Sequence, residues 1–257
     1  MLDLNSSTVE IAAPDGVADA YLARPDDRPH PGVLFIMDAY GLRPTIDEMA
    51  DRLASDGYVV LAPNVFYRAG RAPVLLVPDM SDPGQRTGFF ESVRPLIDEL
   101  TPERLAADGA AYLDCLGEVA APGPVAITGY CMGGRVGWRI AAAHPDRVAA
   151  LAAFHPGRLV TDAPDSPHRS AAEVKAEMYF GFADRDPSMT AEQIATLEQT
   201  LEEVGAHYRS EVYEGALHGY TMADQASYDE AARERHFHKL RALLERTLAE
   251  HTAPGND

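Results

Sequence analysis

The sequence predicts one α/β domain, in which helices cover both faces of a mostly parallel central sheet. Short apolar segments typical of buried strands alternate along the chain with amphipathic segments typical of helices. The 257 residues are 46% hydrophobic and 24% charged, which suits one large core better than two small ones. Since the sequence has no internal repeat and no domain linker, we expect residues 1–257 to form a single domain.

The strands are placed by runs of apolar or alternating residues. These runs predict strands at 9–12, 17–23, 33–37, 58–62, 125–128, 148–154, 177–183 and 207–213. The first two are close in sequence, so we expect them to form an antiparallel hairpin at the start of the sheet.

The helices are placed by capping signals and amphipathic spacing. Thr45 with Glu48 and Thr190 with Gln193 have the spacing of capping boxes, so helices are expected to begin there and to end at the next glycine. Amphipathic spacing predicts further helices at 101–116, 132–143 and 228–251, with a frayed segment from 251 to 257. Two polar stretches, 64–86 and 163–169, are expected to be loops at the rim of a pocket.

Charge and cysteine content restrict the function. The chain has 22 basic and 40 acidic side chains, a formal charge of -18, which disfavours binding to nucleic acid or to anionic membrane surfaces. No apolar run approaches the roughly 20 residues that span a bilayer. The N-terminus has no basic, apolar leader, and there are only two cysteines, so we expect a cytoplasmic protein acting on a small molecule. Both a monomer and a small homo-oligomer remain open.

The most informative segment is a turn at Cys131, between a buried strand and a helix. Residues 125–134 read Val-Ala-Ile-Thr-Gly-Tyr-Cys-Met-Gly-Gly. A nucleophile on such a sharp turn needs flanking glycines, because a Cβ at those positions would collide with the strand or the helix. The helix N-terminus favours the thiolate of Cys131, and the backbone N–H of Met132 is free to bind an oxyanion. The turn therefore predicts a cysteine nucleophile.

Other interpretations of these cysteines stay open. A free cysteine is often a small buried core residue, and we read Cys115 in that way because it lies on the apolar side of the helix at 101–116. A dinucleotide-binding loop at Cys131 is disfavoured. Its glycine spacing differs from G-x-G-x-x-G, and no acidic residue closes the strand at 148–154.

A cysteine nucleophile needs a histidine base and a carboxylate that orients the histidine. Asp184 follows the strand at 177–183 and His218 follows the strand at 207–213, which gives the chain order nucleophile, acid, histidine. Asp184 lies in the polar turn Asp-Arg-Asp-Pro, where aspartates commonly bind backbone N–H groups, so Asp186 is the reserve candidate. The other histidines are weaker candidates, and none has the spacing of a zinc site.

Three motifs together resemble the dienelactone hydrolase family of α/β-hydrolases, over about residues 9–248. They are the elbow at 129–134, the acid turn Gly-Phe-Ala-Asp at 181–184 and the loop Gly-Ala-Leu-His-Gly at 215–219. The resemblance implies an α/β-hydrolase fold and a triad of Cys131, Asp184 and His218. It further implies hydrolysis of esters, thioesters or the lactone carboxymethylenebutenolide through a thioester acyl-enzyme, without a metal or organic cofactor.

The resemblance also assigns residues near the nucleophile. The family carries a glutamate on the loop after an early central strand, held near the resting cysteine, and this loop supplies a second oxyanion N–H. Here Asp38 matches the glutamate but is one methylene shorter. Ala39 would offer the second N–H, and Tyr40 fills an aromatic place.

The remaining pocket residues concern a substrate carboxylate, which the family's lactone hydrolases bind with arginines. One of these arginines lies four residues after the catalytic histidine, where this chain has Met222, whose side chain cannot bind a carboxylate. Arg68 and Arg71 are the two candidates for the other. His155 occupies a position that tends to be aromatic in the family.

Two other functional classes were weighed. A ligand-binding protein that keeps the hydrolase fold is favoured by Asp38 and Met222, but the complete set of nucleophile, acid and histidine argues against it. A thiol-dependent redox enzyme is disfavoured because there is no second cysteine in C-x-x-C spacing.

Overall fold

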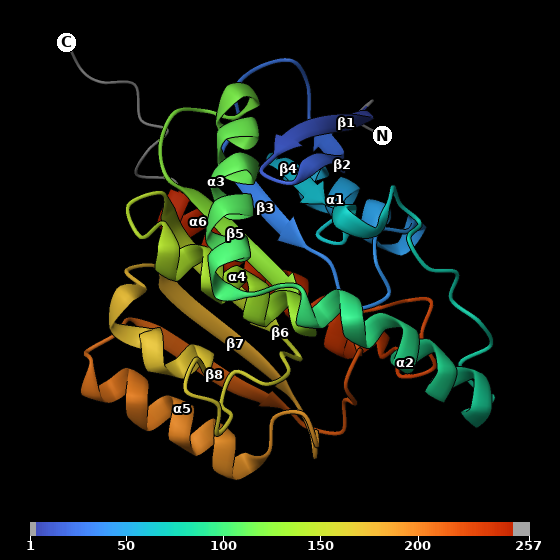
Figure 1. Ribbon diagram of the computed structural model, residues 1–257. Coiled ribbons are helices and arrows are strands. Elements are labelled where there is room, and N and C mark those ends of the chain that lie inside the picture. The colour runs from blue at the N-terminus through green and yellow to red at the C-terminus, as the bar shows by residue number, and fades with distance from the viewer. Residues whose placement is uncertain (1–3, 249–257) are drawn as a thin grey trace.

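The computed structural model describes residues 4–248, and the predicted α/β architecture is confirmed (Figure 1). Eight strands form one sheet in the order β1-β2-β4-β3-β5-β6-β7-β8. The strands are β1 (Asn5–Ala13), β2 (Gly16–Arg24), β3 (Gly32–Ile36), β4 (Val59–Pro63), β5 (Val125–Tyr130), β6 (Val148–Phe154), β7 (Glu177–Ala183) and β8 (Tyr208–Tyr213). The helices are α1 (Pro44–Ser55), α2 (Pro83–Asp98), α3 (Pro102–Val119), α4 (Met132–Ala143), α5 (Ala191–Glu203) and α6 (Glu230–Leu248), with short 3-10 helices η1 (Tyr67–Ala69) and η2 (Pro167–Glu173).

The sheet is antiparallel at one side and parallel elsewhere. β1 pairs with β2 and β2 pairs with β4 in antiparallel fashion, so the predicted entry hairpin is confirmed. From β4 to β8 every neighbouring pair is parallel. All residues of β3, β4 and β5 are buried, as expected for strands covered by helices on both faces.

The helices form two layers (Figure 1). α3 packs on β3, β4 and α4, and α4 packs on β5 and β6, so these two helices share one face of the sheet. On the other face, α6 packs behind β5, β6 and β7, and α1 packs on β2 and β4. Ion pairs join the last two helices, including Arg52 with Glu234. Both layers leave the carboxyl ends of the parallel strands free for loops, which is where α/β folds bind ligands.

Two helix starts differ in how well the sequence predicted them. The capping box of Thr190 and Gln193 is present at the start of α5. The capping box expected at Thr45 is wrong, because α1 begins one residue earlier with Pro44, and Arg43 at the N-cap makes no side-chain cap bond. Proline at the first helical position already fixes the backbone angle, so this helix begins without a side-chain cap.

The main element that the sequence did not predict is α2. Its first turn falls in the stretch 64–86 that we expected to be a loop, and Asp82 caps it by accepting a hydrogen bond from the backbone N–H of Gln85. Only Phe89 and Val93 of this helix are buried, so it has no continuous apolar stripe to reveal it. The expected frayed segment from 251 to 257 lies outside the described residues.

Among the described residues, no helix is long and apolar enough to cross a membrane.

Candidate active site

Cys131 lies on a sharp turn between β5 and α4, with a φ of 55° and a ψ of -119°. The glycines around it are required by close backbone contacts. A Cβ on Gly129 would lie 2.2 Å from the carbonyl oxygen of Gly133, and a Cβ on Gly133 would lie 2.5 Å from the carbonyl oxygens of Ile36 and Met37. The glycine requirement predicted from the sequence is therefore confirmed.

Backbone hydrogen bonds hold this strained turn against the end of β6. The N–H of Cys131 donates to the carbonyl oxygen of Phe154 at 3.1 Å. The carbonyl oxygen of Cys131 accepts from the N–H groups of Gly134 and Gly157, at 3.2 and 3.3 Å. A residue with positive φ persists only where its surroundings fix it, and these bonds provide that support.

The partner of His218 is Asp186, and the expectation that Asp184 would orient this ring is wrong. Nδ1 of His218 lies 2.6 Å from Oδ2 of Asp186. The other oxygen of Asp186 accepts hydrogen bonds from the backbone N–H and the hydroxyl of Ser188, at 2.8 and 2.6 Å. The Asp186 side chain is only 2% exposed, whereas that of His218 is 31% exposed. A buried carboxylate thus fixes a partly accessible imidazole.

The local backbone explains why the acid lies two residues later than expected. Asp184, directly after β7, uses its side chain to accept a hydrogen bond from the backbone N–H of Gly215 at 3.1 Å. Its own N–H donates to the carbonyl oxygen of Ala216. Arg185 then has a φ of 50°, which reverses the chain and brings Asp186 to the ring of His218. The reserve candidate is therefore the residue that the structure places at the histidine.

The charges of the site favour a protonated imidazole. Burial alone would lower the pKa of His218, but the negative charge of the Cys131 side chain and the hydrogen bond to Asp186 raise it to about 10. Burial would raise the pKa of Asp186, yet the contact with His218 holds it below its usual value. The arrangement therefore favours an imidazolium between a carboxylate and the sulfur.

Two residues that line a cavity with Cys131 have backbone N–H groups without an acceptor among the described residues, namely Ala39 and Met132. Ala39 follows β3, and Met132 is the first residue of α4. Both residues line a cavity that also contains Cys131. The sequence analysis named these two groups as oxyanion donors, and that assignment stays a prediction.

The carboxylate of Asp38 binds Arg43, Gln225 and the backbone of Tyr40, and not Cys131. Arg43 donates to both of its carboxylate oxygens, at 2.6 and 3.0 Å. Its oxygens also accept from the backbone N–H of Tyr40 at 3.0 Å and from Gln225 at 2.9 Å. Asp38 therefore lines the cavity as part of an ion-paired group, in which Arg43 also binds Asp224.

Two cavities meet at Cys131. The first has a volume of about 330 Å³ and the second about 370 Å³. Both are lined by Ala39, Phe90, Cys131 and His218. The first cavity is lined in addition by Asp38, Tyr40, Met80, Arg86, His155, Gly219, Asp224, Gln225, Ala226 and Ser227. The predicted rim stretch 64–86 thus contributes to it, whereas no residue of 163–169 lines either cavity.

Of the predicted substrate-binding residues, Tyr40 and His155 line the first cavity together with Asp38. His155 is fully buried, and its Nε2 lies 2.7 Å from the hydroxyl oxygen of Thr221. Its Nδ1 has no hydrogen-bond partner among the described residues. Burial and the neighbouring His218 lower the pKa of His155 well below its usual value, so its ring is neutral.

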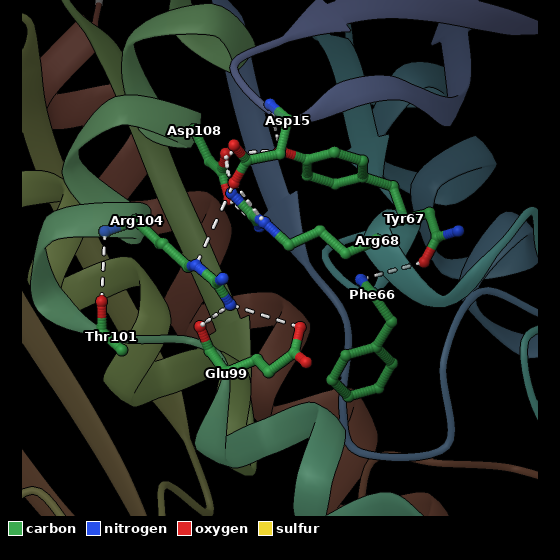
Figure 2. Close-up of polar contacts among 9 residues, drawn as sticks. Asp15, Phe66, Tyr67, Arg68, Glu99, Thr101, Arg104 and Asp108 are labelled. Carbon is green, nitrogen blue, oxygen red and sulfur yellow. Dashed lines mark hydrogen bonds and ion pairs between the residues drawn. The ribbon is translucent and has the colours of Figure 1, made fainter.

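The expectation that Arg68 binds substrate is wrong. Figure 2 shows its guanidinium held between two carboxylates, at 2.7 Å from Asp108 and 2.8 Å from Asp15. Tyr67 donates a further hydrogen bond to Asp108. Since Arg68 lies on η1 after β4, these contacts fix that loop against α3 and leave no donor for the cavities beside Cys131.

Two further residues that the sequence predicted at the substrate pocket, Arg71 and Met222, lie elsewhere in the structure. Arg71 pairs with Glu10 at 2.6 Å on the surface and lines neither cavity. Met222 is four residues after His218 but is fully buried in the hydrophobic core. It therefore has a packing role.

The structure adds residues that the sequence prediction missed. The second cavity is lined by residues from α2, α4 and the loops after β6 and β7. Besides Met132 and the four that it shares with the first cavity, they are Val93, Arg94, Ile97, Asp98, Arg135, Gly157, Arg158 and Ser188. One signal was available for Arg135, because it follows Cys131 by four residues on the predicted helix and hence by about one helical turn. No comparable signal existed for the residues of α2.

Comparisons with known proteins concern the family and the fold of this chain. The model of the dienelactone hydrolase family matches residues 18–248. A protein of Yersinia pestis named "Putative carboxymethylenebutenolidase" is 29% identical over 220 residues, covering 81% of this chain and 76% of its own. A protein of Synechocystis sp. with the same name is 26% identical and covers 96% of this chain and 99% of its own. In fold, the chain is similar to a crystal structure titled "Putative Dienelactone Hydrolase" from Klebsiella pneumoniae, with a TM-score of 0.82, 23% identity and coverage of 95% and 99%.

Proposed function

Because the chain belongs to the dienelactone hydrolase family, we propose that it hydrolyses a carboxylic ester or lactone, with Cys131 as the nucleophile. In this proposal His218 is the general base and Asp186 is the carboxylate that orients it. The observation that carries the proposal is the 2.6 Å contact between His218 and the buried Asp186, on a ring that shares two cavities with Cys131. The names of the relatives in Yersinia pestis and Synechocystis sp. support a lactone among the substrates.

The proposed reaction has two halves, each using the same groups. In the first, His218 holds the proton of the thiol while the sulfur of Cys131 attacks the carbonyl carbon. The N–H groups of Ala39 and Met132 bind the resulting oxyanion, and each such donor lowers the barrier by roughly 3 kcal/mol. The C–O bond then breaks, the leaving oxygen takes the proton from His218, and a thioester remains.

In the second half, a water molecule takes the place of the leaving alcohol, or of the freed hydroxyl end of an opened lactone. His218 removes a proton from the water as it attacks the thioester, and the same two N–H groups hold the second oxyanion. The C–S bond breaks, the acid is released and the sulfur is again paired with the imidazolium. The raised pKa of His218, about 10, supports a resting state of this kind.

The first experiment replaces each cysteine in turn and measures hydrolysis of 4-nitrophenyl acetate and of a panel of neutral lactones. Cys131→Ala is expected to lower kcat/KM at least about 1000-fold, because it removes the group that forms the covalent intermediate. Cys115→Ala is the matched control, since Cys115 is half-buried on α3 and lines neither cavity. Hydrolysis at the parental rate by Cys131→Ala would refute the proposal.

The rival function, ligand binding without catalysis, predicts a different pattern. A binding protein would show no burst of 4-nitrophenol and no faster alkylation at Cys131 than a free thiol with iodoacetamide. The proposed hydrolase is expected to show both. The third alternative, a thiol-dependent redox enzyme, is tested with dilute peroxide. If that function is correct, peroxide converts Cys131 into a sulfenic acid or an intermolecular disulfide.

A further inference from the structure

The segment 73–98, which contains α2, forms part of the wall of both cavities beside Cys131. Figure 1 shows α2 at the edge of the molecule, with the start of the helix pointing away from the sheet. The residues of this segment that line the first cavity are Met80, Arg86 and Phe90, and those that line the second are Phe90, Val93, Arg94, Ile97 and Asp98. The way in which the segment is attached to the rest of the protein therefore affects access to Cys131.

Polar contacts do not attach this segment. Within the described residues 4–248, residues 73–98 form no hydrogen bond or ion pair with the rest of the chain, apart from backbone bonds to residues 99 and 100 directly after them. Their side-chain bonds are local, such as those of Ser81 with Asp79 and of Gln85 with Asp82. Such a segment can be displaced without leaving buried donors or acceptors unpaired.

The residues just before the segment, in contrast, are firmly held. The backbone N–H of Ala72 donates to the carboxylate of Asp19 at 2.9 Å. Asp19 is buried and also accepts a hydrogen bond from Asn64 at 2.9 Å. Arg71 pairs with Glu10 at 2.6 Å. The chain is thus fixed to β1 and β2 where the segment begins.

The residue just after the segment is fixed as well. Arg104 on α3 donates to the backbone carbonyl oxygen and to the carboxylate of Glu99, each at 3.3 Å. Arg104 also lies 4.0 Å from Asp15, which binds Arg68 at 2.8 Å. Figure 2 shows Arg68, from the loop before the segment, and Glu99, after it, in this one polar cluster. Two fixed ends that lie close together, with a weakly attached segment between them, form the arrangement of a hinged lid.

Apolar side chains provide the attachment. Only Phe89 and Val93 of α2 are buried. The ring of Phe89 meets that of Tyr40 edge to face, with 5.1 Å between the ring centroids. The neighbouring Phe90 lies 6.3 Å from Tyr40 by the same measure and is still 44% exposed, although it lines both cavities. Apolar contacts are not directional, so a bound substrate can add to those of Phe90 or replace them.

We propose that residues 73–98 form a lid that opens to admit the substrate to Cys131 and closes on an apolar part of it. The contact of Phe89 with Tyr40 is the latch of this lid, and because the contact is formed, the structure is that of the closed lid. The inference rests on the proposed hydrolase function and adds the conformational step that controls access to its nucleophile.

The first test measures access to the sulfur. N-ethylmaleimide and a maleimide coupled to a large polyethylene glycol react by the same chemistry, but the large reagent reaches Cys131 only when the lid is open. Both rates are measured in a Cys115→Ala background. Phe89→Ala removes the latch and is expected to raise the large-to-small rate ratio at least about tenfold. Phe89→Leu keeps an apolar side chain and should give an intermediate ratio.

Two control variants separate lid opening from other effects. Glu91→Ala changes an exposed residue of the same helix that lines neither cavity, so the ratio should stay within about twofold of the parent. Leu201→Ala removes a fully buried side chain from α5 and weakens the whole fold without touching the lid. An unchanged ratio in Phe89→Ala, or an equal rise in Leu201→Ala, would overturn the inference.

The kinetic test asks whether the lid closes on the substrate. Phe89 lines neither cavity, so Phe89→Ala can affect a bound ester only through the position of the lid. The acyl part is varied with 4-nitrophenyl acetate and hexanoate, and the alcohol part with ethyl and hexyl acetate. In one pair, the long-to-short ratio of kcat/KM should fall at least about fivefold in Phe89→Ala, because the long chain loses apolar wall. Equal losses for long and short esters in both pairs would contradict closure on the substrate.

Hydrogen exchange provides a readout that needs neither turnover nor a thiol reagent. A helix of this length is barely stable in water once it leaves the body of the protein. Phe89→Ala should therefore speed up amide exchange in α2 at least about tenfold and leave exchange in α4 unchanged. Exchange in α2 at the parental rate would show that Phe89 does not hold the lid.

These readouts separate failure of the inference from failure of the proposed function. If esters are cleaved in a Cys131-dependent way but Phe89→Ala changes neither maleimide access nor exchange in α2, the lid is wrong and the hydrolase function stands. If no ester or lactone is cleaved, the hydrolase function fails, and maleimide access and exchange then show whether the segment opens at all.

Discussion

The Nδ1 atom of His218 lies 2.6 Å from Asp186, while Asp184, two residues earlier, uses its carboxylate to bind the backbone N–H of Gly215. The two aspartates come from one turn, Asp-Arg-Asp-Pro, so their substitutions provide a matched comparison. They have the same charge and almost the same position in the sequence, yet only one of them contacts the proposed base.

We expect Asp186→Asn to lower kcat for ester hydrolysis at least about 100-fold, because the amide cannot stabilise the imidazolium and favours another orientation or tautomer of the ring. Asp184→Asn keeps an oxygen that can accept from Gly215, so its kcat should stay within about threefold of the parent. Steady-state kinetics on one ester, with thermal unfolding of both variants, checks this. A larger loss of kcat in Asp184→Asn than in Asp186→Asn would return the acid role to Asp184.

The raised pKa of His218 predicts how stability changes with pH. Its value of about 10 in the folded protein lies above the ordinary 6.5, so the folded state holds a proton that the unfolded state releases. The stabilisation is complete below pH 6.5 and is lost as the pH rises to about 10, at up to about 1.4 kcal/mol per pH unit. The difference in unfolding free energy between the parent and His218→Gln should therefore shrink over this window.

Urea denaturation at several pH values between 6 and 10 measures this difference. Cys131→Ala is the control, since it removes the charge that does most to raise the pKa of His218. The pH dependence of its stability should be weaker than that of the parent. A difference between parent and His218→Gln that stays constant over the whole window would contradict the assignment of a charged His218.

The sequence could indicate that Cys131 and His218 lie at one cavity because each lies on a strongly patterned segment. Cys131 is between a buried strand and an amphipathic helix, with glycines that a sharp turn requires, and His218 follows a clear strand. The choice between Asp184 and Asp186 depends on a single positive φ at Arg185. Single-residue backbone reversals leave no periodic signal, so the sequence could offer both aspartates but not decide between them.

The cavity walls could be predicted less well than the places of Cys131 and His218. Arg68 and Arg71 lie in a loop whose path is set by distant carboxylates such as Asp108 on α3. Nothing near them in the sequence specifies those partners. Conversely, Arg94 lies on α2, a helix with too few buried residues to be recognised from its pattern. The positions of these arginines follow from tertiary packing, which overrides local pattern.

The buried pair of Asp38 and Arg43 should contribute strongly to stability. Their side chains are 3% and 9% exposed, and Arg43 also contacts Asp224 at 2.5 Å. Arg43→Met leaves Asp38 without its cation and is expected to lower the unfolding free energy by about 3 kcal/mol. The double variant Asp38→Asn with Arg43→Met should recover part of this loss, because no buried carboxylate is then left unpaired at this position.

The control for that experiment is the exposed pair of Arg71 and Glu10, which has the same 2.6 Å contact but side chains that are 64% and 59% exposed. Arg71→Met should cost much less than Arg43→Met, because exposed ion pairs contribute little to stability. Chemical denaturation compares the variants. Equal losses for Arg43→Met and Arg71→Met would show that the Asp38 pair does not hold its loop.

The turn at Cys131 should tolerate no side chain at Gly129. In Gly129→Ala the added Cβ would lie 2.2 Å from the carbonyl oxygen of Gly133, a backbone atom that cannot move without displacing the start of α4. We expect this variant to lose several kcal/mol of unfolding free energy, or to fail to fold, and to lose esterase activity with it.

Gly88→Ala is the matched control on α2, where no atom lies within 4 Å of the added Cβ. There, alanine should raise stability by roughly 0.5 to 1 kcal/mol, because it favours a helix more than glycine does. Thermal unfolding and ester hydrolysis of the two variants measure the contrast, and a stable, active Gly129→Ala would mean that the turn at the nucleophile differs from the one described.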